Sequence, residues 1–323
     1  MKSRTFGLLI ASLLLFSCSN EKSTEEQKTQ AYLGVKEGGE WIWVTKNNGN
    51  QQYEYQGGAF KPVNELKVDQ KHTDHSFDIQ FEGPGWESDK IGYRLYLDWR
   101  NATDIFGKKV DTLVLQNVGL DGFDSYHEMS DWGVDVLKVG SSLGIGSVAF
   151  WDGEKAIRVE ETDSIYCAVE SSKKLSQVLV NYYGWQINNI KTDLISKLEI
   201  EEGSYLTKYE LKLSESLPNL TTGIVKLPGT TVLVFDDLKS GWNCLATFGK
   251  QTLQEDNLGM CIFYKTDEVL ELTQDKYSHV VVLKPKNKKL TYYFGAAWEQ
   301  DESGVKTMAD FKAFLKTQVQ YIK

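Results

Sequence analysis

The pattern of apolar and polar residues follows a period of two along most of the chain, which is typical of β-strands. Short strand-like runs are separated by turns rich in Gly, Asn, Asp and Lys. We predict strands at residues 40–44, 76–81, 91–99, 112–116, 147–151, 177–183, 209–213, 231–235, 244–248, 260–265, 279–284 and 290–295. So many strands in a chain of 323 residues predict an all-β fold, built as a large two-sheet sandwich.

Only two segments have the apolar spacing expected of a helix, one internal at residues 126–139 and one C-terminal at 308–322. Their apolar stripes are formed by Met129, Trp132, Val136 and Val139 in the first and by Met308, Phe311, Phe314 and Leu315 in the second. Because no Ser-, Thr- or Pro-rich linker follows residue 30, we expect a single domain over residues 34–323.

The N-terminus has the features of a secretory signal. Lys2 and Arg4 precede an apolar run that is too short to span a bilayer. Ser17 and Cys18 follow, with Leu15 three positions before the cysteine. This pattern predicts a lipoprotein signal peptide over residues 1–17 and lipidation of Cys18, with a plain signal peptide as the alternative.

The polar residues 18–33 have no apolar periodicity and are expected to form a disordered tether. Its acidic residues resemble the surface-export signal of Bacteroidetes lipoproteins. We therefore expect an outer-membrane lipoprotein that faces the periplasm or the cell surface. Its contact with the membrane would be made only through the N-terminal lipid.

Composition limits the partners of the chain. A net charge of −9 argues against a broad nucleic-acid-binding surface. Cys167, Cys244 and Cys261 lack metal-ligand spacing, so we expect buried free thiols, with a Cys244–Cys261 disulfide as the alternative. Aromatic residues make up 12% of the chain and include nine Trp, which suits stacking on sugars as well as a large core. Oligomeric state has no signal in the sequence.

Arginine is scarce, and two of the three arginines after residue 4 lie in one predicted strand. Alternation places Arg94, Tyr96, Asp98 and Arg100 on one face and Tyr93, Leu95, Leu97 and Trp99 on the other. A guanidinium matches the geometry of carboxylate or sulfate groups. We predict that this face binds an anion, while internal Arg–Asp–Arg pairing on an exposed face is the alternative.

A loop rich in Gly and Asp leads into the predicted internal helix, where His127, Asp131 and Asp135 would share one face. Histidine beside carboxylates suits proton transfer near neutral pH. We therefore predict that His127 is catalytic. A structural His127–Asp131 hydrogen bond is the alternative.

The same residues also allow a metal hypothesis. His127, Glu128 and Asp131 resemble the zinc pattern HExxH with its second His replaced. No third ligand is evident, so we expect no cofactor, with calcium or zinc at Glu128 and Asp131 as a weaker alternative. We expect His72 and His75 to be solvated in a polar loop.

Several stretches also resemble a known bacterial family. They are Trp86-Glu87-Ser88-Asp89, YRLYLDWRNATDIFGKK at residues 93–109, QNVGLDGFDSYHEMSDWGVDVLKVGSSLGIGSVAFW at 116–151 and YYFGAAW at 292–298. The chain is similar to a secreted family labelled as a domain of unknown function and frequent in Bacteroidetes polysaccharide-degradation clusters. The resemblance implies a galactose-mutarotase-like β-supersandwich. It also implies an activity, since the family looks to include an ulvan oligosaccharide dehydratase, although a shared fold does not fix function.

The leading hypothesis is a dehydratase or lyase acting on an acidic, ulvan-like oligosaccharide. A dehydratase would remove water from the non-reducing-end uronic acid and leave a 4,5-unsaturated sugar. We expect Arg94, Arg100 and Asn117 to bind the carboxylate, with Asp98 beside them. His127 would act with a tyrosine, Tyr96 or Tyr126, as base and acid. Trp132 or Trp99 could stack on the sugar, although the core is the expected place for both.

Other functions also fit the sequence. A glycoside hydrolase would use two carboxylates chosen among Asp98, Asp121, Asp124, Glu128 and Asp131. A non-catalytic surface glycan-binding lipoprotein would need only the tether and the aromatic residues. A mutarotase- or epimerase-like activity is a further alternative.

Overall fold

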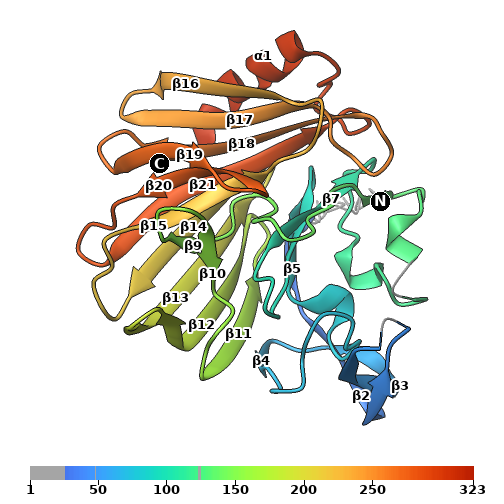
Figure 1. Ribbon diagram of the computed structural model, residues 1–323. Coiled ribbons are helices and arrows are strands. Elements are labelled where there is room, and N and C mark those ends of the chain that lie inside the picture. The colour runs from blue at the N-terminus through green and yellow to red at the C-terminus, as the bar shows by residue number, and fades with distance from the viewer. Residues whose placement is uncertain (1–25, 48, 123–124) are drawn as a thin grey trace, which may run out of the picture.

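Long strands with alternating buried and exposed residues form the largest sheet of this computed structural model, which describes residues 26–47, 49–122 and 125–323. The sheet has nine antiparallel strands in the order β16-β17-β18-β21-β14-β13-β12-β11-β4 (Figure 1). Their bounds are β4 Glu65–Lys67, β11 Ser164–Ser171, β12 Leu175–Ile187, β13 Ile190–Glu201, β14 Leu206–Leu213, β16 Thr231–Lys239, β17 Trp242–Lys250, β18 Asn257–Lys265 and β21 Lys289–Trp298.

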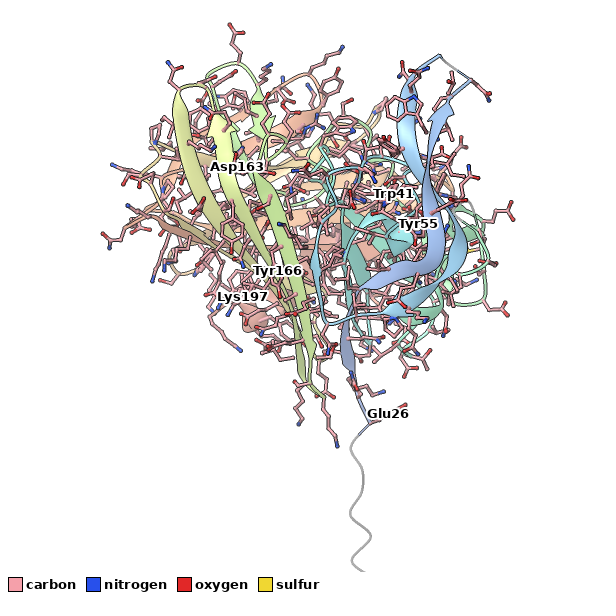
Figure 2. The ribbon with its side chains drawn as sticks, turned by 90° about the horizontal axis from the view of Figure 1, so that it is seen from below. Glu26, Trp41, Tyr55, Asp163, Tyr166 and Lys197 are labelled. Carbon is pink, nitrogen blue, oxygen red and sulfur yellow. The ribbon has the colours of Figure 1, made fainter. Side chains whose placement is uncertain are left out.

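The two faces of this sheet differ in polarity. On β13, the buried Leu194, Leu198 and Ile200 face the core, whereas Lys197 on the opposite face pairs with glutamates of β13 and β14. Figure 2 shows Lys197 and Tyr166 on this outer face. The sheet is therefore solvated on one side and packed on the other, as alternating strands predict.

Two five-stranded sheets cover the inner face, in the orders β1-β5-β6-β7-β8 and β10-β9-β15-β20-β19. Their bounds are β1 Thr29–Tyr32, β5 Gly85–Ser88, β6 Gly92–Leu95, β7 Thr103–Lys108, β8 Gly133–Asp135, β9 Ala149–Trp151, β10 Ala156–Arg158, β15 Leu220–Val225, β19 Val269–Gln274 and β20 Ser278–Leu283. The bridges Thr103↔Gly144 and Ile145↔Ile224 join the two sheets. Gly144 has φ +59°, and a Cβ there would lie 1.9 Å from the Thr103 carbonyl oxygen, so only glycine fits this junction.

The core between the two layers is rich in aromatic residues. Trp86 stacks on Tyr93 at 5.8 Å, and Tyr93 contacts Phe294 edge-on at 5.5 Å. The indole of Trp86 donates a hydrogen bond to Thr207 at 2.8 Å. These contacts tie β5 and β6 to β14 and β21, and so fix β6, which carries Arg94, against the large sheet.

A separate hairpin of β2 Gly34–Thr45 and β3 Gln51–Pro62 projects from the body (Figure 2). Trp41 packs against Tyr55 at 5.3 Å and Trp43 against Tyr53 at 4.7 Å. The backbone N–H of Tyr55 donates to the carbonyl of Ser76 at 2.7 Å. The hairpin thus rests on the polar loop that follows β4.

At the other end of the chain, α1 Met308–Gln318 begins with a capping box of Thr307 and Asp310. Phe311 stacks on Phe248 of β17 at 5.4 Å. A 3₁₀ turn, Val319–Tyr321, follows the helix. The predicted C-terminal helix is therefore confirmed over most of its length, and it covers one end of the large sheet.

The all-β, two-layer prediction is confirmed, but three local predictions are wrong. Residues 76–81 form no strand, because Ser76 and Gln80 bond within the loop region, to Asp78 at 2.6 Å and to the Val118 carbonyl at 2.6 Å. Residues 112–116 end in the 3₁₀ turn Leu115–Asn117. The backbone N–H groups of Val114 and Leu115 donate to Glu87 and so hold the chain at the start of this turn.

The internal helix predicted at residues 126–139 is also wrong. Its first residues lie in a 3₁₀ turn, Ser125–His127, and Gly133–Asp135 instead pairs with β7 as strand β8. Trp132 packs on Phe106 at 6.0 Å. Val136 and Val139 of the predicted apolar stripe are buried but Met129 is exposed, and sheet pairing rather than a helix satisfies the backbone.

The predicted tether is shorter than expected. Residues predicted as disordered up to 33 include β1, which pairs with β5, and Leu33 is buried. Cys18 and the signal peptide lie outside the described residues. No helix in the part that the structure describes is long and apolar enough to cross a membrane. Cys167, Cys244 and Cys261 are buried free thiols, as predicted.

Candidate active site

Arg94 lies in a buried ionic cluster at the edge of three neighbouring strands. The register of β6 and β7 places it opposite Asp104, and its Nε and Nη2 donate to Asp104 Oδ2 at 3.2 and 2.7 Å. Nη2 also donates to Asp135 Oδ2 on β8 at 2.5 Å. The Arg94 side chain is only 2% exposed. Its guanidinium therefore serves carboxylates of the protein itself.

Two tyrosines complete this cluster. Tyr96 Oη donates to Asp104 Oδ2 at 2.5 Å, and Arg94 Nη1 donates to Tyr126 Oη at 3.1 Å. Burial raises the pKa of both tyrosines. Burial, followed by repulsion from Asp104, also raises the pKa of Asp135. Burial in the cluster therefore favours the protonated forms of Tyr96, Tyr126 and Asp135.

Arg100 forms a second cluster beside the first. It donates to three carboxylates, which are Asp98 at 2.9 Å, Asp74 at 2.9 Å and Glu82 at 2.8 Å. Its guanidinium carbon lies 3.9 Å from the ring centroid of Tyr96, and that of Arg94 lies 4.7 Å from the same centroid. Tyr96 therefore connects the two clusters through cation–π contacts.

His75 extends the second cluster toward solvent. Its Nδ1 lies 2.5 Å from Asp74 Oδ1, and this hydrogen bond is the main cause of the raised pKa of His75. Burial alone would raise the pKa of Asp74, but the bond with His75 and the charge of Arg100 outweigh it and lower the value to about 2. His75 was expected to be solvated, and so was His72, whose buried side chain instead bonds Asp78 at 2.8 Å.

The backbone around these clusters is strained. His75, Phe77, Phe81 and Glu82 have φ values of 59°, 60°, 40° and 69°, and Asn101 has 39°. Residues other than glycine rarely adopt this left-handed backbone conformation, and each one destabilises the folded state by on the order of 1–3 kcal/mol. The surrounding contacts must hold this strain, which often accompanies a functional site.

A pocket of about 450 Å³ opens over the clusters and is lined by Arg94, Tyr96, Arg100, Asp104 and His127. We call it the polar pocket. Trp99 lies at this pocket with 42% of its surface exposed, which corrects the expectation that it belongs to the core. The guanidinium carbon of Arg158 lies 4.9 Å from the Trp99 ring centroid. All three arginines after residue 4 therefore meet in this region.

His127 enters the polar pocket from the turn before β8. Its side chain is 34% exposed, and its Nε2 lies 3.4 Å from Asp135 Oδ2. Its ring centroid lies 4.5 Å from that of Tyr126. Of the three residues predicted as catalytic, His127 is partly exposed, whereas Tyr96 and Tyr126 are buried.

Lys138 lines the same pocket from the segment after β8. It is exposed and makes no ion pair within residues 26–47, 49–122 and 125–323. Arg94 and Arg100, in contrast, are committed to protein carboxylates. Lys138 is therefore the cation of the polar pocket that can accept an anionic group of a substrate.

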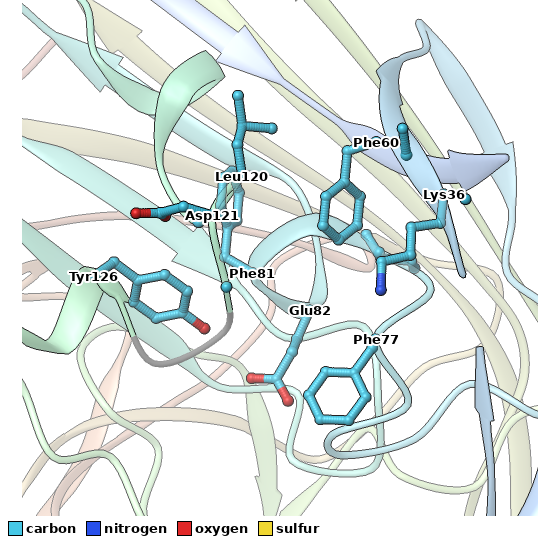
Figure 3. A pocket seen from close by; sticks show the side chains of 13 residues that line it. Lys36, Phe60, Phe77, Phe81, Glu82, Leu120, Asp121 and Tyr126 are labelled. Carbon is cyan, nitrogen blue, oxygen red and sulfur yellow. The ribbon is translucent and has the colours of Figure 1, made fainter. Parts of the chain in front are cut away.

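Figure 3 shows a second pocket, which has a volume of about 520 Å³. We call it the aromatic pocket. Phe60, Phe77 and Phe81 line it together with Lys36. Glu82 and Tyr126 also line it and bond Arg100 and Arg94 of the polar pocket. These two buried residues therefore lie between the two pockets.

The structure does not bring all the predicted site residues together. Asn117 is exposed and lines a different hollow with Gln30 and Gln116. Trp132 belongs to a small aromatic cluster with Phe106. Glu128 and Asp131 are exposed in the turn before β8, without the helix on which their metal-binding spacing depended. Asp98 lies with Arg100 as predicted.

Sequence reasoning missed several residues of the site. Asp104 and Asp135 were not recognised as the partners of Arg94, although Asp104 follows it in the next strand. Lys138 and Glu82 carried no signal among many lysines and glutamates. Arg158 could have been found, because the scarcity of arginine that marked Arg94 and Arg100 applies equally to it.

Comparison with known proteins gives one decisive match. The model of a family described as a domain of unknown function, DUF4861, matches residues 12–323. The chain belongs to this family. No curated protein matches it. A crystal structure described as an aldose 1-epimerase from Klebsiella pneumoniae subsp. pneumoniae MGH 78578 is similar over 90% of this chain and 95% of that chain, with 10% identity and a TM-score of 0.39. Those values are too low for any inference about this chain.

In this member of the DUF4861 family, a metal site has one candidate among the described residues. Asp74, His75 and Glu82 each place a ligand atom within 4.8 Å of the others. Arg100, however, donates to both carboxylates. Because the guanidinium already supplies the positive charge that a metal would bring, these residues do not fit a metal centre.

Proposed function

We propose that the chain is a carbohydrate-active carbon–oxygen lyase that removes water from the non-reducing-end uronic acid of an acidic oligosaccharide. The observation that carries the proposal is the composition of the polar pocket. Trp99 offers an exposed ring for sugar stacking, and Lys138 offers a cation that has no ion pair in the described part of the chain. His127 offers a partly exposed imidazole next to a buried acid. These are the groups that a uronic acid and a proton transfer require.

In this reaction a base removes the proton from C5, and the electron pair of the C–H bond forms the C4=C5 double bond. The C4–O bond breaks, and the hydroxyl leaves as water after it receives a proton. We assign the base to His127, which Asp135 orients at 3.4 Å. Tyr96, whose raised pKa keeps it protonated, is the candidate acid in the same pocket. Such groups each contribute roughly 10²–10⁴ in rate.

Removal of the C5 proton becomes easier when the neighbouring carboxylate is neutralised. We assign this role to Lys138, because the neighbouring Arg100 is already held by Asp98, Asp74 and Glu82. Arg94 is instead a positioning residue, since its donors hold Asp104, Asp135 and Tyr126. This assignment replaces the sequence-based expectation that Arg94 and Asn117 contact the substrate.

The test is incubation with a panel of uronic-acid-ended oligosaccharides, followed by ultraviolet absorbance and product mass together. We expect a new chromophore and the loss of one water. His127→Gln should lower the rate by at least roughly 100-fold, whereas His279→Gln, a histidine of β20 outside the polar pocket, should leave it unchanged.

Other products would assign a different function. A chromophore with chain cleavage would mean an oligosaccharide lyase, and cleavage without a chromophore would mean a hydrolase. Binding without product across the panel would mean a glycan-binding protein. A near-normal rate for His127→Gln would refute the role of His127.

A further inference from the structure

We infer that the aromatic pocket is a second sugar subsite, which binds a ring carrying a sulfate or carboxylate group. Its place next to the reacting sugar rests on the proposed function, but its ligand chemistry does not. The substrate class follows from both sites together: an oligosaccharide with an anionic group on the reacting sugar and another on a neighbouring unit.

Lys36 of β2 is the residue that selects an anion. Its Nζ lies 5.2 Å from the ring centroid of Phe60 and 5.9 Å from that of Phe77. Lys36 makes no ion pair within the described part of the chain, whereas Lys46 and Lys61 of the same hairpin pair with Glu54 and Glu37. An ammonium between aromatic rings and without a carboxylate partner is suited to an incoming anion.

The electrostatics around Lys36 agree with this role. Burial lowers the pKa of Lys36, and the nearby Asp78 opposes that shift. Two further carboxylates line the pocket, but Glu82 is bound by Arg100, and Asp121 accepts from Ser125 at 2.6 Å. Neither is paired with Lys36, so they remain as acceptors for sugar hydroxyls.

The walls of the aromatic pocket suit a sugar ring. Phe60, Phe81 and Leu120 supply apolar surface, while Lys36 and Glu82 extend polar ends into the space between them (Figure 3). The volume of about 520 Å³ falls within the range of roughly 300–1,000 Å³ for small-molecule sites. A ring with one apolar face and one charged substituent matches this combination of aromatic wall and cation.

The position of the pocket explains why the second unit would belong to the same substrate. Glu82 and Tyr126 line the aromatic pocket and directly bond Arg100 and Arg94, which line the polar pocket. The strained residues Phe77, Phe81 and Glu82 all face this pocket. Strain kept at a pocket wall indicates that the shape of the wall matters.

The test is isothermal titration calorimetry of galactose 6-sulfate and of neutral galactose with the full protein and four variants. Lys36→Gln should weaken binding of the sulfated sugar by at least roughly tenfold and remove its preference over galactose. Lys61→Gln is the matched control on the same hairpin and should bind normally. Lys138→Gln should also bind normally, which would place the sugar away from the polar pocket.

Leu120→Glu provides an independent variant, because Leu120 is an exposed wall residue whose change should not disturb folding. The added carboxylate should repel the sulfate and weaken binding as Lys36→Gln does. Thermal melting of each variant checks the fold. Equal binding by wild type and both pocket variants, or no binding of the sulfated sugar at all, would overturn the inference.

The same variants separate this inference from the proposed function. Lys36-dependent binding without any elimination product would keep the subsite and reject the dehydratase. Elimination with an unchanged KM in Lys36→Gln, on oligosaccharides that carry a second anionic unit, would keep the dehydratase and reject the subsite.

Discussion

At the scale of single residues, Arg94 shows how a scarce residue can be held by the carboxylates of the protein itself. The guanidinium of Arg94 donates hydrogen bonds to Asp104, Asp135 and Tyr126. Replacing it would leave two carboxylates buried next to each other without their cation, and such a broken buried pair typically costs about 3–5 kcal/mol. We therefore expect Arg94→Met to lower the free energy of unfolding by about that amount in urea denaturation.

Arg158→Met is the matched control, because Arg158 stacks on the exposed Trp99 and pairs loosely with Glu160 at 3.9 Å. It should change the free energy of unfolding by less than about 1 kcal/mol. Adding Asp135→Asn to Arg94→Met should restore part of the loss, since the repulsion between Asp104 and Asp135 is removed. An Arg94→Met variant as stable as wild type would contradict the cluster described above.

At the scale of elements, the loop from Asp74 to Glu82 is held by charge rather than by strand pairing. The pKa of Asp74 is lowered to about 2, so its stabilising effect is present above about pH 4 and is lost as the pH falls toward 2. The pKa of His75 is raised, so its effect is present below about pH 6.5 and is lost as the pH rises through the raised value.

The difference in melting temperature between wild type and His75→Gln should therefore be largest between about pH 4 and pH 6.5. Differential scanning fluorimetry from pH 3 to pH 9 measures it. His279→Gln is a control of opposite sign, because burial and Lys226 lower the pKa of His279, and that histidine therefore favours the folded state more as the pH rises. A His75→Gln difference that stays constant with pH would contradict the Asp74–His75 pair.

The same loop shows where sequence reasoning succeeds and fails at this scale. Strands of the large sheet such as β12 and β14 were predicted correctly because apolar alternation and burial agree there. Residues 76–81 also alternate, but Ser76 donates to Asp78 inside the loop and Gln80 donates to the carbonyl of Val118 in another loop. Alternation reports which side chains are buried, and not whether the backbone is paired. The internal helix failed similarly, since apolar spacing fits both a helix and the turn before β8.

At the scale of the whole molecule, the site depends on the junction of the two layers. Arg94 and Asp104 come from adjacent strands, whereas Asp135, Lys138 and Arg158 are brought to them from later segments. These residues come together only in the folded chain, which explains why the sequence indicated Arg94, Arg100 and His127 but missed Asp104, Glu82 and Lys138. A chain of net charge −9 thus brings three of its four arginines together in one region.

We also propose that the whole molecule is held at a membrane by lipidated Cys18. Cys18 lies eleven residues before Thr29, the first residue of β1, and a fully extended chain of that length spans at most roughly 40 Å. The folded domain would therefore stay near the bilayer, and nothing else in the described residues offers a spanning helix.

Cys18→Ser should move the protein from the membrane fraction to the soluble fraction after cell lysis, while its activity on soluble oligosaccharides is kept. Ser19→Ala is the neighbouring control and should remain in the membrane fraction. Equal membrane association of wild type and Cys18→Ser would reject the lipid anchor without affecting the proposed site, because no residue that lines the polar pocket precedes Asp74.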